Sequence, residues 1–585
     1  MGLPRALKAH GQGDLDQAEH HYKRALEQNV RDPILFQNYG ALLRSQGKEA
    51  EADVIYKQGL SLFPDHIGLL TNRANLLREE APASSLACHF SALRLLRRDS
   101  SKPPAAAPFI NTVAHLRELG LHQWAWALAR EALSLVGPHA ELLLQCLLLQ
   151  DGASTGAETE ATTRLRQRLE SQLDDCAPLE RSEVLMALAS HHLGQSEVGR
   201  AEALFEQAMG TLTSLSTTEV DDLRKAQQLV DVNSWNYSIT LLQQQQLERG
   251  WQMFEHGLRT PAAGPQRWQR AMKKPFSAEQ LPLWRGESLE GRRLLLLEEQ
   301  AIGDAMMFCT LIPTLLEEAA QLGLVVSDRL LPIYRRSFAI QIEAGTMQVC
   351  SHQQLKEGAV SPGAYDVQTP LGSICQYRFQ QIERYGNHLP LLKAQPDQVE
   401  QFRGQYLNDG SPAERLVGLS WNGGGKGKRI KQKSLDPTVF GELLGGLPGV
   451  RFVSLQYGKA EPVVEAWRQQ GLDVIHDPRV NPLKDMDLWL AQVAACDGVL
   501  SVANTTIHGA GGLNVPTLCL LSRFLDWRWF ADASVSRSYW YPSVGMARES
   551  LQEGWQPALT EARQWLEQGC PMPNGPVHTH ESVAV

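Results

Sequence analysis

Apolar residues in the first 258 positions recur at helical spacing, and a set of small and aromatic positions returns 34 residues later. The matching positions are Ala18 and Ala52, Tyr22 and Tyr56, Leu26 and Leu60, and Asn38 and Asn72. A period of this length is typical of two antiparallel helices that bury their apolar faces only by stacking on the next pair. Weaker copies follow, and a last helix pair is predicted from Trp235 to about Leu258. The pattern therefore predicts a helical repeat array over residues 1–258, interrupted by a polar loop at 151–163.

The second half of the chain changes to short apolar runs that alternate with helical stripes, which predicts parallel α/β structure. The predicted strands are Arg293–Leu297, Leu324–Val326, Val417–Trp421, Val450–Leu455, Asp473–His476, Val499–Val502 and Thr517–Leu521. The predicted organisation is a linker at 259–292, a first lobe at 293–395, a second lobe at 396–545, a C-terminal helix at 546–570 and a disordered tail at 571–585. Because ligands bind at the carboxyl ends of such strands, the loops after the strands become the candidate site.

Composition and charge limit the kinds of molecule that the chain is expected to bind and the compartment in which it is expected to occur. The chain has 56 Lys and Arg against 65 Asp and Glu, a net charge of -9, so it lacks the overall basic field that binds nucleic acid. Its nine cysteines form no C-x-x-C pair, which favours reduced thiols. The segment from Met1 to Asp14 lacks the apolar core of a signal peptide, and no apolar run reaches the roughly 18 residues of a membrane span. We expect a soluble, cytoplasmic protein.

Residues 501–510 bring hydroxyl groups and an imidazole to a predicted strand-to-helix junction. Free N–H groups and the partial positive charge of a helix start favour a bound diphosphate, with Asn504, Thr505, Thr506 and His508 as its candidate ligands. His508 is also a candidate catalytic residue, together with Asp304. The alternative is structural: Asn504 or Thr505 caps the helix, and His508 is a core histidine.

A glycine- and cation-rich loop, residues 422–434, is a second candidate for contacts with phosphate. Its glycines allow close backbone approach, and its five cations, Lys426, Lys428, Arg429, Lys431 and Lys433, can neutralise phosphate. The loop is not a Walker A motif, because Arg429 stands where that motif needs Ser or Thr. The alternative is a solvated basic loop.

The loop after the first predicted strand supplies carboxylates for the general-base step of a transfer reaction. Asp304 is the preferred candidate, with Gln300 and Gly303 beside it on the acceptor side of the cleft. Glu298 and Glu299 compete with Asp304, which has the alternative role of a helix cap. No metal site is predicted, although His578 and His580 stand in the polar tail.

The aromatic residues between 526 and 542 have two interpretations. The segments Asp526–Trp529 and Trp540–Pro542 either line the cleft, stacking on a base or sugar, or pack in the core.

Three segments together resemble bacterial proteins that join tetratricopeptide repeats to a heptosyltransferase-like domain. They are Pro282 to Asp304; Gly418 to Trp421 with the basic loop and Ser454 to Gly458; and Asp497 to His508 continued through Pro516 to Trp529 and Trp540–Pro542. The resemblance implies two Rossmann-like lobes of GT-B architecture in a metal-independent transferase, which uses a nucleotide sugar as co-substrate and no cofactor.

The same resemblance assigns roles to individual residues. It implies that the acceptor binds the first lobe, near Asp304, and that the donor nucleotide binds the second. Thr505, Thr506 and His508 would contact the diphosphate, and Gln456 would lie near the nucleotide. Lys428 and Arg429 would be auxiliary cations.

These patterns lead to two hypotheses of function. In the first, the chain transfers a sugar from a nucleoside diphosphate to a protein or glycan acceptor, and the repeats bind the acceptor or a partner protein. In the second, the transferase fold has lost catalysis and the chain is a scaffold. The sequence leaves open the donor base, the sugar, the acceptor and the oligomeric state.

Overall fold

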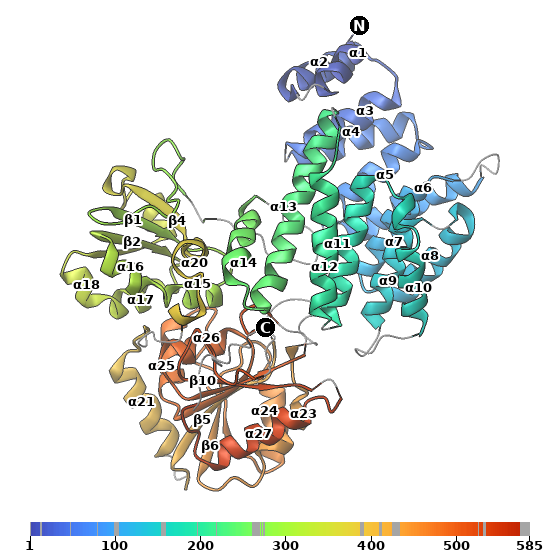
Figure 1. Ribbon diagram of the computed structural model, residues 1–585. Helices are drawn as coiled ribbons and strands as arrows, with labels where there is room; N and C mark the ends of the chain where they lie inside the picture. Colours follow the sequence, from blue (N-terminus) through green and yellow to red (C-terminus); the bar gives the residue numbers. More distant parts are fainter. Residues whose placement is uncertain are drawn as a thin grey trace, which may run out of the picture. The chain divides into compact units, whose positions relative to one another are not determined.

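The computed structural model divides the chain into two compact units, Met1–Ala187 and Leu188–Val585 (Figure 1). The residues it describes are all except 1, 12–13, 47, 79, 99–103, 138, 154–159, 196, 218, 260–269, 271, 273–274, 386–390, 409–411, 424–432, 524–525, 531–533, 551 and 574–585. Each unit is described in turn.

The first unit is a stack of antiparallel helix pairs. Its helices are α1 (Gly2–Gly11), α2 (Leu15–Glu27), α3 (Pro33–Ser45), α4 (Glu49–Leu62), α5 (Ile67–Leu76), α6 (Pro82–Arg98), α7 (Ala106–Glu118), α8 (His122–Val136), α9 (Ala140–Ala153) and α10 (Glu160–Glu170). The repeated positions Ala18, Tyr22, Ala52 and Tyr56 are buried. A Cβ added at Gly40 would stand 2.3 Å from Cε1 of Tyr56, so the helices can approach this closely only with a small residue there. This arrangement confirms the tetratricopeptide-like fold predicted from the 34-residue period.

Helices of the same kind continue into the second unit. Helix α11 (Pro178–Gly194) crosses the boundary, and α12 (Val198–Thr213), α13 (Val220–Gln243) and α14 (Leu247–Phe254) follow. The helical region ends with a short 3-10 helix at Glu255–Leu258. Trp251 and Phe254 of α14 belong to the same buried cluster as the α/β core, which explains why the last helices group with the lobes rather than with the first unit.

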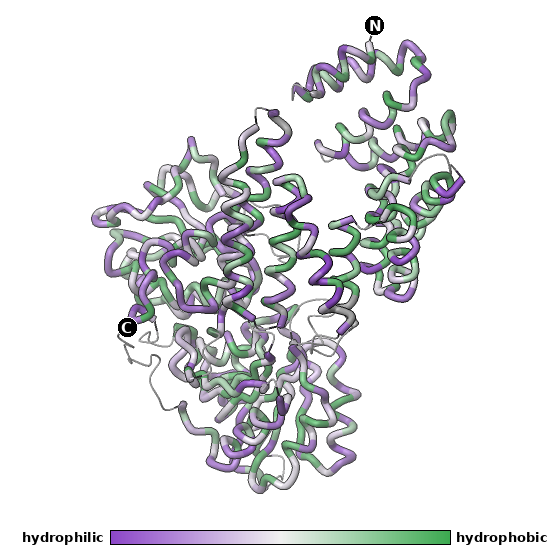
Figure 2. The backbone as a smooth tube through the Cα atoms, turned by 45° about the vertical axis from the view of Figure 1, so that its right-hand side comes forward, coloured by the Kyte–Doolittle hydropathy of each residue, from purple (hydrophilic) through white to green (hydrophobic). Residues whose placement is uncertain are grey.

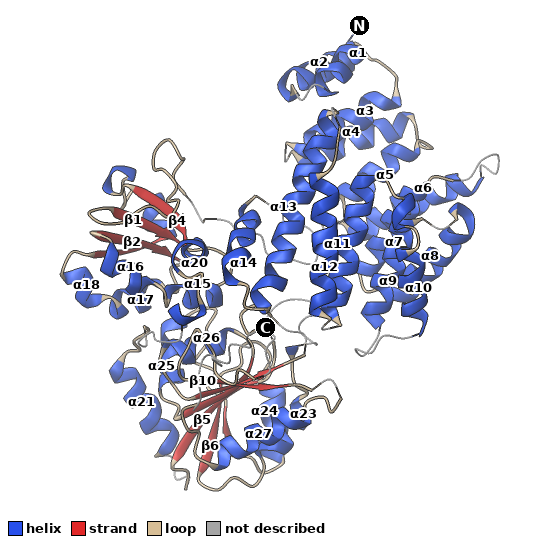
Figure 3. Ribbon diagram, in the orientation of Figure 1, coloured by secondary structure: helices blue, strands red, loops and turns tan. Residues whose placement is uncertain are grey.

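The first lobe contains a four-stranded parallel sheet in the order β3-β2-β1-β4 (Figure 3). Its strands are β1 (Arg293–Leu297), β2 (Gln321–Val326), β3 (Met347–Ser351) and β4 (Val367–Pro370). Its helices are α15 (Ile302–Cys309), α16 (Ile312–Glu318), α17 (Leu331–Ser337), α18 (Ala339–Glu343), α19 (His352–Lys356) and α20 (Ile374–Arg378). Strand β1 has the predicted bounds, because a strand buried on both faces reads as an unbroken apolar run.

The second lobe contains a six-stranded parallel sheet in the order β10-β9-β8-β5-β6-β7. Its strands are β5 (Arg415–Ser420), β6 (Val450–Ser454), β7 (Val474–Ile475), β8 (Gly498–Val502), β9 (Thr517–Leu521) and β10 (Val544–Arg548). Its helices are α21 (Pro396–Leu407), α23 (Pro437–Leu444), α24 (Glu461–Gln469), α25 (Met486–Ala494), α26 (Thr505–Gly512) and α27 (Gln556–Glu567). The structure thus has the two Rossmann-like lobes that the sequence predicts.

The C-terminal part differs in detail from the prediction. The predicted boundary at 545 falls inside β10, and the expected separate helix at 546–570 is α27, which packs on β9 and β10 as part of the second lobe. Most of the predicted tail, from 574 onward, lies outside the described residues.

Hydropathy varies along the helices of both units in short alternating stretches (Figure 2). Within the described part of the chain, the model contains no helix with the length and apolar character needed to cross a bilayer.

Candidate functional site

A cleft of about 310 Å³ lies between the two lobes of the second unit. The first lobe contributes Gln300, Ala301, Ile302 and Arg329, and the second contributes Leu455, Tyr457, Pro482, Leu483, Met486, Trp489, Thr505 and Thr506. Many of these residues follow β1, β2, β6 and β8, so the cleft lies at the carboxyl edges of both sheets, where ligands of such folds bind. Helices α15 and α26, which follow the central strands, pack against each other beside it (Figure 1).

The start of α26 is fixed by Asn504, and this fits the structural role considered for that residue. Its Oδ1 accepts the N–H of Thr506 at 2.8 Å, and its Nδ2 donates to Ser420 Oγ at 2.7 Å and to the Asn422 carbonyl at 2.9 Å. Asn504 therefore caps the helix and ties it to the loop after β5. Thr505 and Thr506 line the cleft.

Gln456 organises the same loop from the end of β6. It is buried, and its Oε1 accepts hydrogen bonds from Ser420 Oγ, Trp421 N and Asn422 N at 3.0, 3.1 and 2.9 Å. Its carbonyl oxygen is thus used within the protein. The predicted contact between Gln456 and a nucleotide stays a prediction.

Asp304 joins the two lobes through an ion pair. Its Oδ2 accepts the N–H of Ala301 at 3.2 Å, and its Oδ1 accepts from Arg528 Nε at 2.8 Å and from a second guanidinium nitrogen. The predicted cap of a helix beginning at Ala305 is wrong, because α15 begins at Ile302; Asp304 lies in its first turn, accepts the N–H of the N-cap residue Ala301 and forms an ion pair with the second lobe. Arg528 bonds to Oδ1, Oδ2 accepts only the one bond from Ala301, and Asp304 is not among the residues that line the cleft, so removal of a substrate proton by Asp304 would require a rearrangement of this ion pair.

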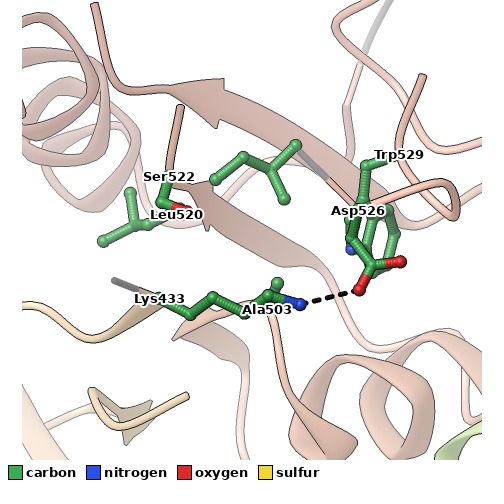
Figure 4. A pocket seen from close by; sticks show the side chains of 7 residues that line it. Lys433, Ala503, Leu520, Ser522, Asp526 and Trp529 are labelled. Carbon is green, nitrogen blue, oxygen red and sulfur yellow. Dashed lines mark hydrogen bonds and ion pairs between the residues drawn. The ribbon is translucent and has the colours of Figure 1, made fainter. Parts of the chain in front are cut away.

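Arg528 links Asp304 to two further charged side chains. Its guanidinium also bonds to Asp526 at 2.6 Å, and Asp526 accepts from Lys433 Nζ at 2.7 Å (Figure 4). Although burial alone would raise the pKa of Asp526, Arg528 and Lys433 hold it well below its ordinary value. The cavity beside Lys433 and Asp526 measures about 10 Å³, room for about one water molecule.

The two competing carboxylates are buried and partnered, and neither lines the cleft. Glu299 accepts from Arg270 at 2.7 and 3.0 Å and from the N–H of Gly372. Glu298 pairs with His352 Nε2 at 2.9 Å. Glu299 thus holds the linker residue Arg270 against the first lobe, and it is not placed to reach an acceptor.

His508 is a buried, neutral imidazole at the boundary between the lobes. Its Nδ1 lies 3.0 Å from Tyr541 Oη, and its ring stacks on Trp529 with centroids 5.9 Å apart. Burial lowers the pKa of His508 to about 4, and Asp304 offsets only part of that effect. At neutral pH, His508 therefore acts through a hydrogen bond and not through positive charge.

The predicted basic loop can be described only at its ends. Lys428 and Arg429 lie outside the described residues. Lys433, at the end of the loop, is neutralised by Asp526.

Arg329 is a cleft residue that the sequence reasoning missed. It is the one charged side chain among the residues that line the cleft, and its guanidinium donates to the Pro482 carbonyl at 3.2 Å. Among the described residues, no carboxylate pairs with it. Because it follows the predicted strand Leu324–Val326, its position after a strand was a signal that could have identified it.

The aromatic segments mostly pack in the core. Trp527 contacts Trp251, Phe254 and Phe308, and Trp540 contacts Phe308 and Tyr385. The packing interpretation is therefore correct for these two tryptophans. The aromatic residues that line the cleft are Tyr457 and Trp489.

No group of three or more His, Cys, Asp or Glu side chains that could hold a metal ion occurs among the residues with described positions.

Comparisons with known proteins give one full-length sequence relative and several partial structural likenesses. No family model matches the chain. It is 25% identical to Protein FlbA of Caulobacter vibrioides over 589 aligned positions, which cover 95% of this chain and 88% of that protein.

Each of the structural likenesses covers less than half of this chain. The E. coli ADP-heptose lps heptosyltransferase II is 13% identical, with a TM-score of 0.34 and coverage of 48% of this chain and 97% of that one. A family 9 glycosyl transferase from Veillonella parvula is 11% identical, with a TM-score of 0.31 and coverage of 45% and 87%. A tetratricopeptide repeat protein from Parabacteroides merdae is 20% identical, with a TM-score of 0.33 and coverage of 43% and 90%. At these scores, the fold assignment depends on the helix pairs and strand orders described above.

Proposed function

We propose that this chain is a glycosyltransferase that moves a sugar from a nucleoside-diphosphate sugar to a protein or glycan acceptor, with the helical repeats recruiting the acceptor or a partner protein. The observation that carries the proposal is the composition of the interlobe cleft. It combines the guanidinium of Arg329, which forms no ion pair with a described carboxylate, with the hydroxyls of Thr505 and Thr506 at the start of α26. Cations and hydroxyl donors at a helix start are suited to a diphosphate.

The proposed donor site uses the two chemically different walls of this cleft. The diphosphate would lie against Thr505, Thr506 and Arg329. The nucleobase would lie against the apolar wall formed by Tyr457, Leu483 and their neighbours; Tyr457 and Leu483 are 40% and 60% exposed. Lys428 and Arg429 would add positive charge from the loop after β5.

Transfer then requires stabilisation of the leaving diphosphate and removal of the proton from the acceptor hydroxyl. Hydrogen-bond donors and a fixed cation near the departing oxygen supply the first effect without a metal ion. Asp304 is the proposed base for the second. Since it is paired with Arg528, the proposal requires that acceptor binding separates the two side chains.

The Asp304–Arg528 pair also favours the second candidate function, a scaffold without catalysis. In that case the pair stays closed, and the transferase fold only presents the helical repeats. Activity separates the candidates: Asp304→Asn abolishes sugar transfer in the enzyme and changes nothing but stability in the scaffold.

The direct test is calorimetric titration of the full chain with UDP-, GDP-, ADP- and CDP-sugars. We expect one base to bind, and Arg329→Ala to weaken that binding by roughly tenfold or more, as expected for the loss of a charge-assisted hydrogen bond. Arg384→Ala is the matched control, because Arg384 is exposed and does not line the cleft. If no nucleotide binds, the transferase proposal is wrong. EDTA leaves transfer unchanged if the reaction is metal-independent.

A further inference from the structure

The imidazole of His508 is held by contacts from both lobes. Trp529 stacks on its face, and Tyr541 bonds to its Nδ1. On the opposite edge, a Cβ added at Gly303 would stand 2.8 Å from Cδ2 and 3.4 Å from Nε2. The Nε2 edge therefore faces the first turn of α15.

Tyr541 is itself held closely against α26. It is 1% exposed, and a Cβ added at Gly511 would stand 2.5 Å from its Cγ. This fit leaves little room for the phenol ring to turn, so the hydroxyl stays directed at Nδ1.

The hydrogen bonds that the Tyr541 hydroxyl can form determine which ring nitrogen of His508 carries the proton. Burial raises the pKa of Tyr541 well above its ordinary value, so the phenol keeps its proton. Within the described part of the chain, its one hydrogen-bond partner is Nδ1. If Nδ1 carried a proton, it would donate to Tyr541 Oη, and the buried phenol O–H would be left without an acceptor among the described residues. Tyr541 therefore donates, Nδ1 accepts, and the ring proton is on Nε2.

His508 and Gly303 are not among the residues that line the cleft, but residues close to them in the sequence are. His508 lies one helical turn after Thr505, and Gly303 follows Ile302; both Thr505 and Ile302 line the cleft. The charged groups around the ring are Asp304, Arg528 and Asp526, which are bonded to one another. An N–H donor thus lies between the starts of α15 and α26.

We propose that Tyr541 is a positioning residue that fixes His508 as a neutral Nε2–H donor, which hydrogen-bonds to the diphosphate oxygens of the donor substrate and does not act as a general base. The diphosphate part rests on the proposed function. The tautomer part does not depend on it, so the two are tested separately.

The tautomer is read from imidazole ¹⁵N chemical shifts in histidine-labelled protein, with the signal of His508 assigned by its absence in His508→Gln. We expect a protonated Nε2 and an unprotonated Nδ1 in the wild type. In Tyr541→Phe, this preference is lost, whereas in Tyr539→Phe, which removes a neighbouring buried hydroxyl that makes no contact with His508, it is kept. A wild-type ring protonated at Nδ1 overturns the proposal.

The functional part is tested by a double-mutant cycle with nucleoside diphosphate affinity as the readout. Tyr541→Phe weakens binding about tenfold, since the donor is no longer fixed. His508→Gln, whose amide nitrogen replaces Nε2 as a donor, retains most of the affinity, and His508→Leu does not. In the His508→Gln background, Tyr541→Phe has little further effect. Additive losses would mean that Tyr541 acts on packing alone and would overturn the positioning role. If the wild type binds no nucleotide, the proposed function fails while the ¹⁵N result still decides the tautomer.

Discussion

Helices α15 and α26, one from each lobe, differ in the charge of their first turns. Each has eight residues and follows a central strand, and the two pack against each other. The first turn of α15 contains Asp304, which bonds to its own N-terminus and to Arg528. The first turn of α26 contains no acid, and its threonines line the cleft. The start of α15 thus carries a carboxylate, whereas the start of α26 has only the neutral cap of Asn504.

The largest expected effect on stability comes from removing the negative charge of Asp304 on α15. Asp304→Asn leaves Arg528 paired only with Asp526 in a buried setting, which costs about 3 kcal/mol of unfolding free energy. Urea unfolding followed by tryptophan fluorescence measures the loss. Asp366→Asn is the control, because the Asp366–Arg293 pair is partly exposed and lies within the first lobe, so its loss should cost much less. Equal losses in the two variants would contradict the interlobe role.

A smaller effect on stability is expected from the neutral imidazole of His508 on α26. The folded pKa of His508 is about 4, below its ordinary value of 6.5, so the unfolded chain gains a proton first as the pH falls. The stability that depends on the neutral ring is fully present above pH 6.5 and is lost as the pH falls to 4. The loss of unfolding free energy reaches about 2 kcal/mol at pH 5. The difference in stability between pH 7 and pH 5 should shrink by this amount in His508→Gln. An unchanged difference would show that the ring is protonated in the folded protein.

The smallest effect probes the contact between the two helices. Gly303→Ala places a methyl group against the imidazole of His508, and we expect a loss of about 1 to 2 kcal/mol. Gly199→Ala on α12 is the matched control: it meets no atom within 4 Å and should be neutral or slightly stabilising. A neutral Gly303→Ala would mean that the helices are free to separate.

The sequence predicts the elements well where one local pattern determines them. The 34-residue period predicts the helix pairs, and apolar runs predict β1 and β9 with their observed bounds. Strands β3, β4 and β10 are missing from the prediction, as their short, mixed sequences lack an apolar run of that kind.

The sequence predicts only part of the candidate site, because the pairing of the site's side chains depends on contacts between residues far apart in the chain. Thr505 and Thr506 follow a visible strand, and they line the cleft as expected. Nothing in the local sequence of Asp304 indicates a partner 224 positions away, so its ion pair with Arg528 could not be predicted. The same holds for Tyr541 and His508, which the fold brings together.

The central claim is that the start of α26 accepts the diphosphate of a nucleotide. Calorimetric titration of the wild type and of Thr505→Val/Thr506→Val with the nucleoside diphosphate preferred by the wild type tests it most directly. The account predicts binding by the wild type and at least a tenfold loss in the variant, with the melting temperature of the unliganded protein nearly unchanged. Equal affinities in the two proteins, or no binding by the wild type, would contradict it.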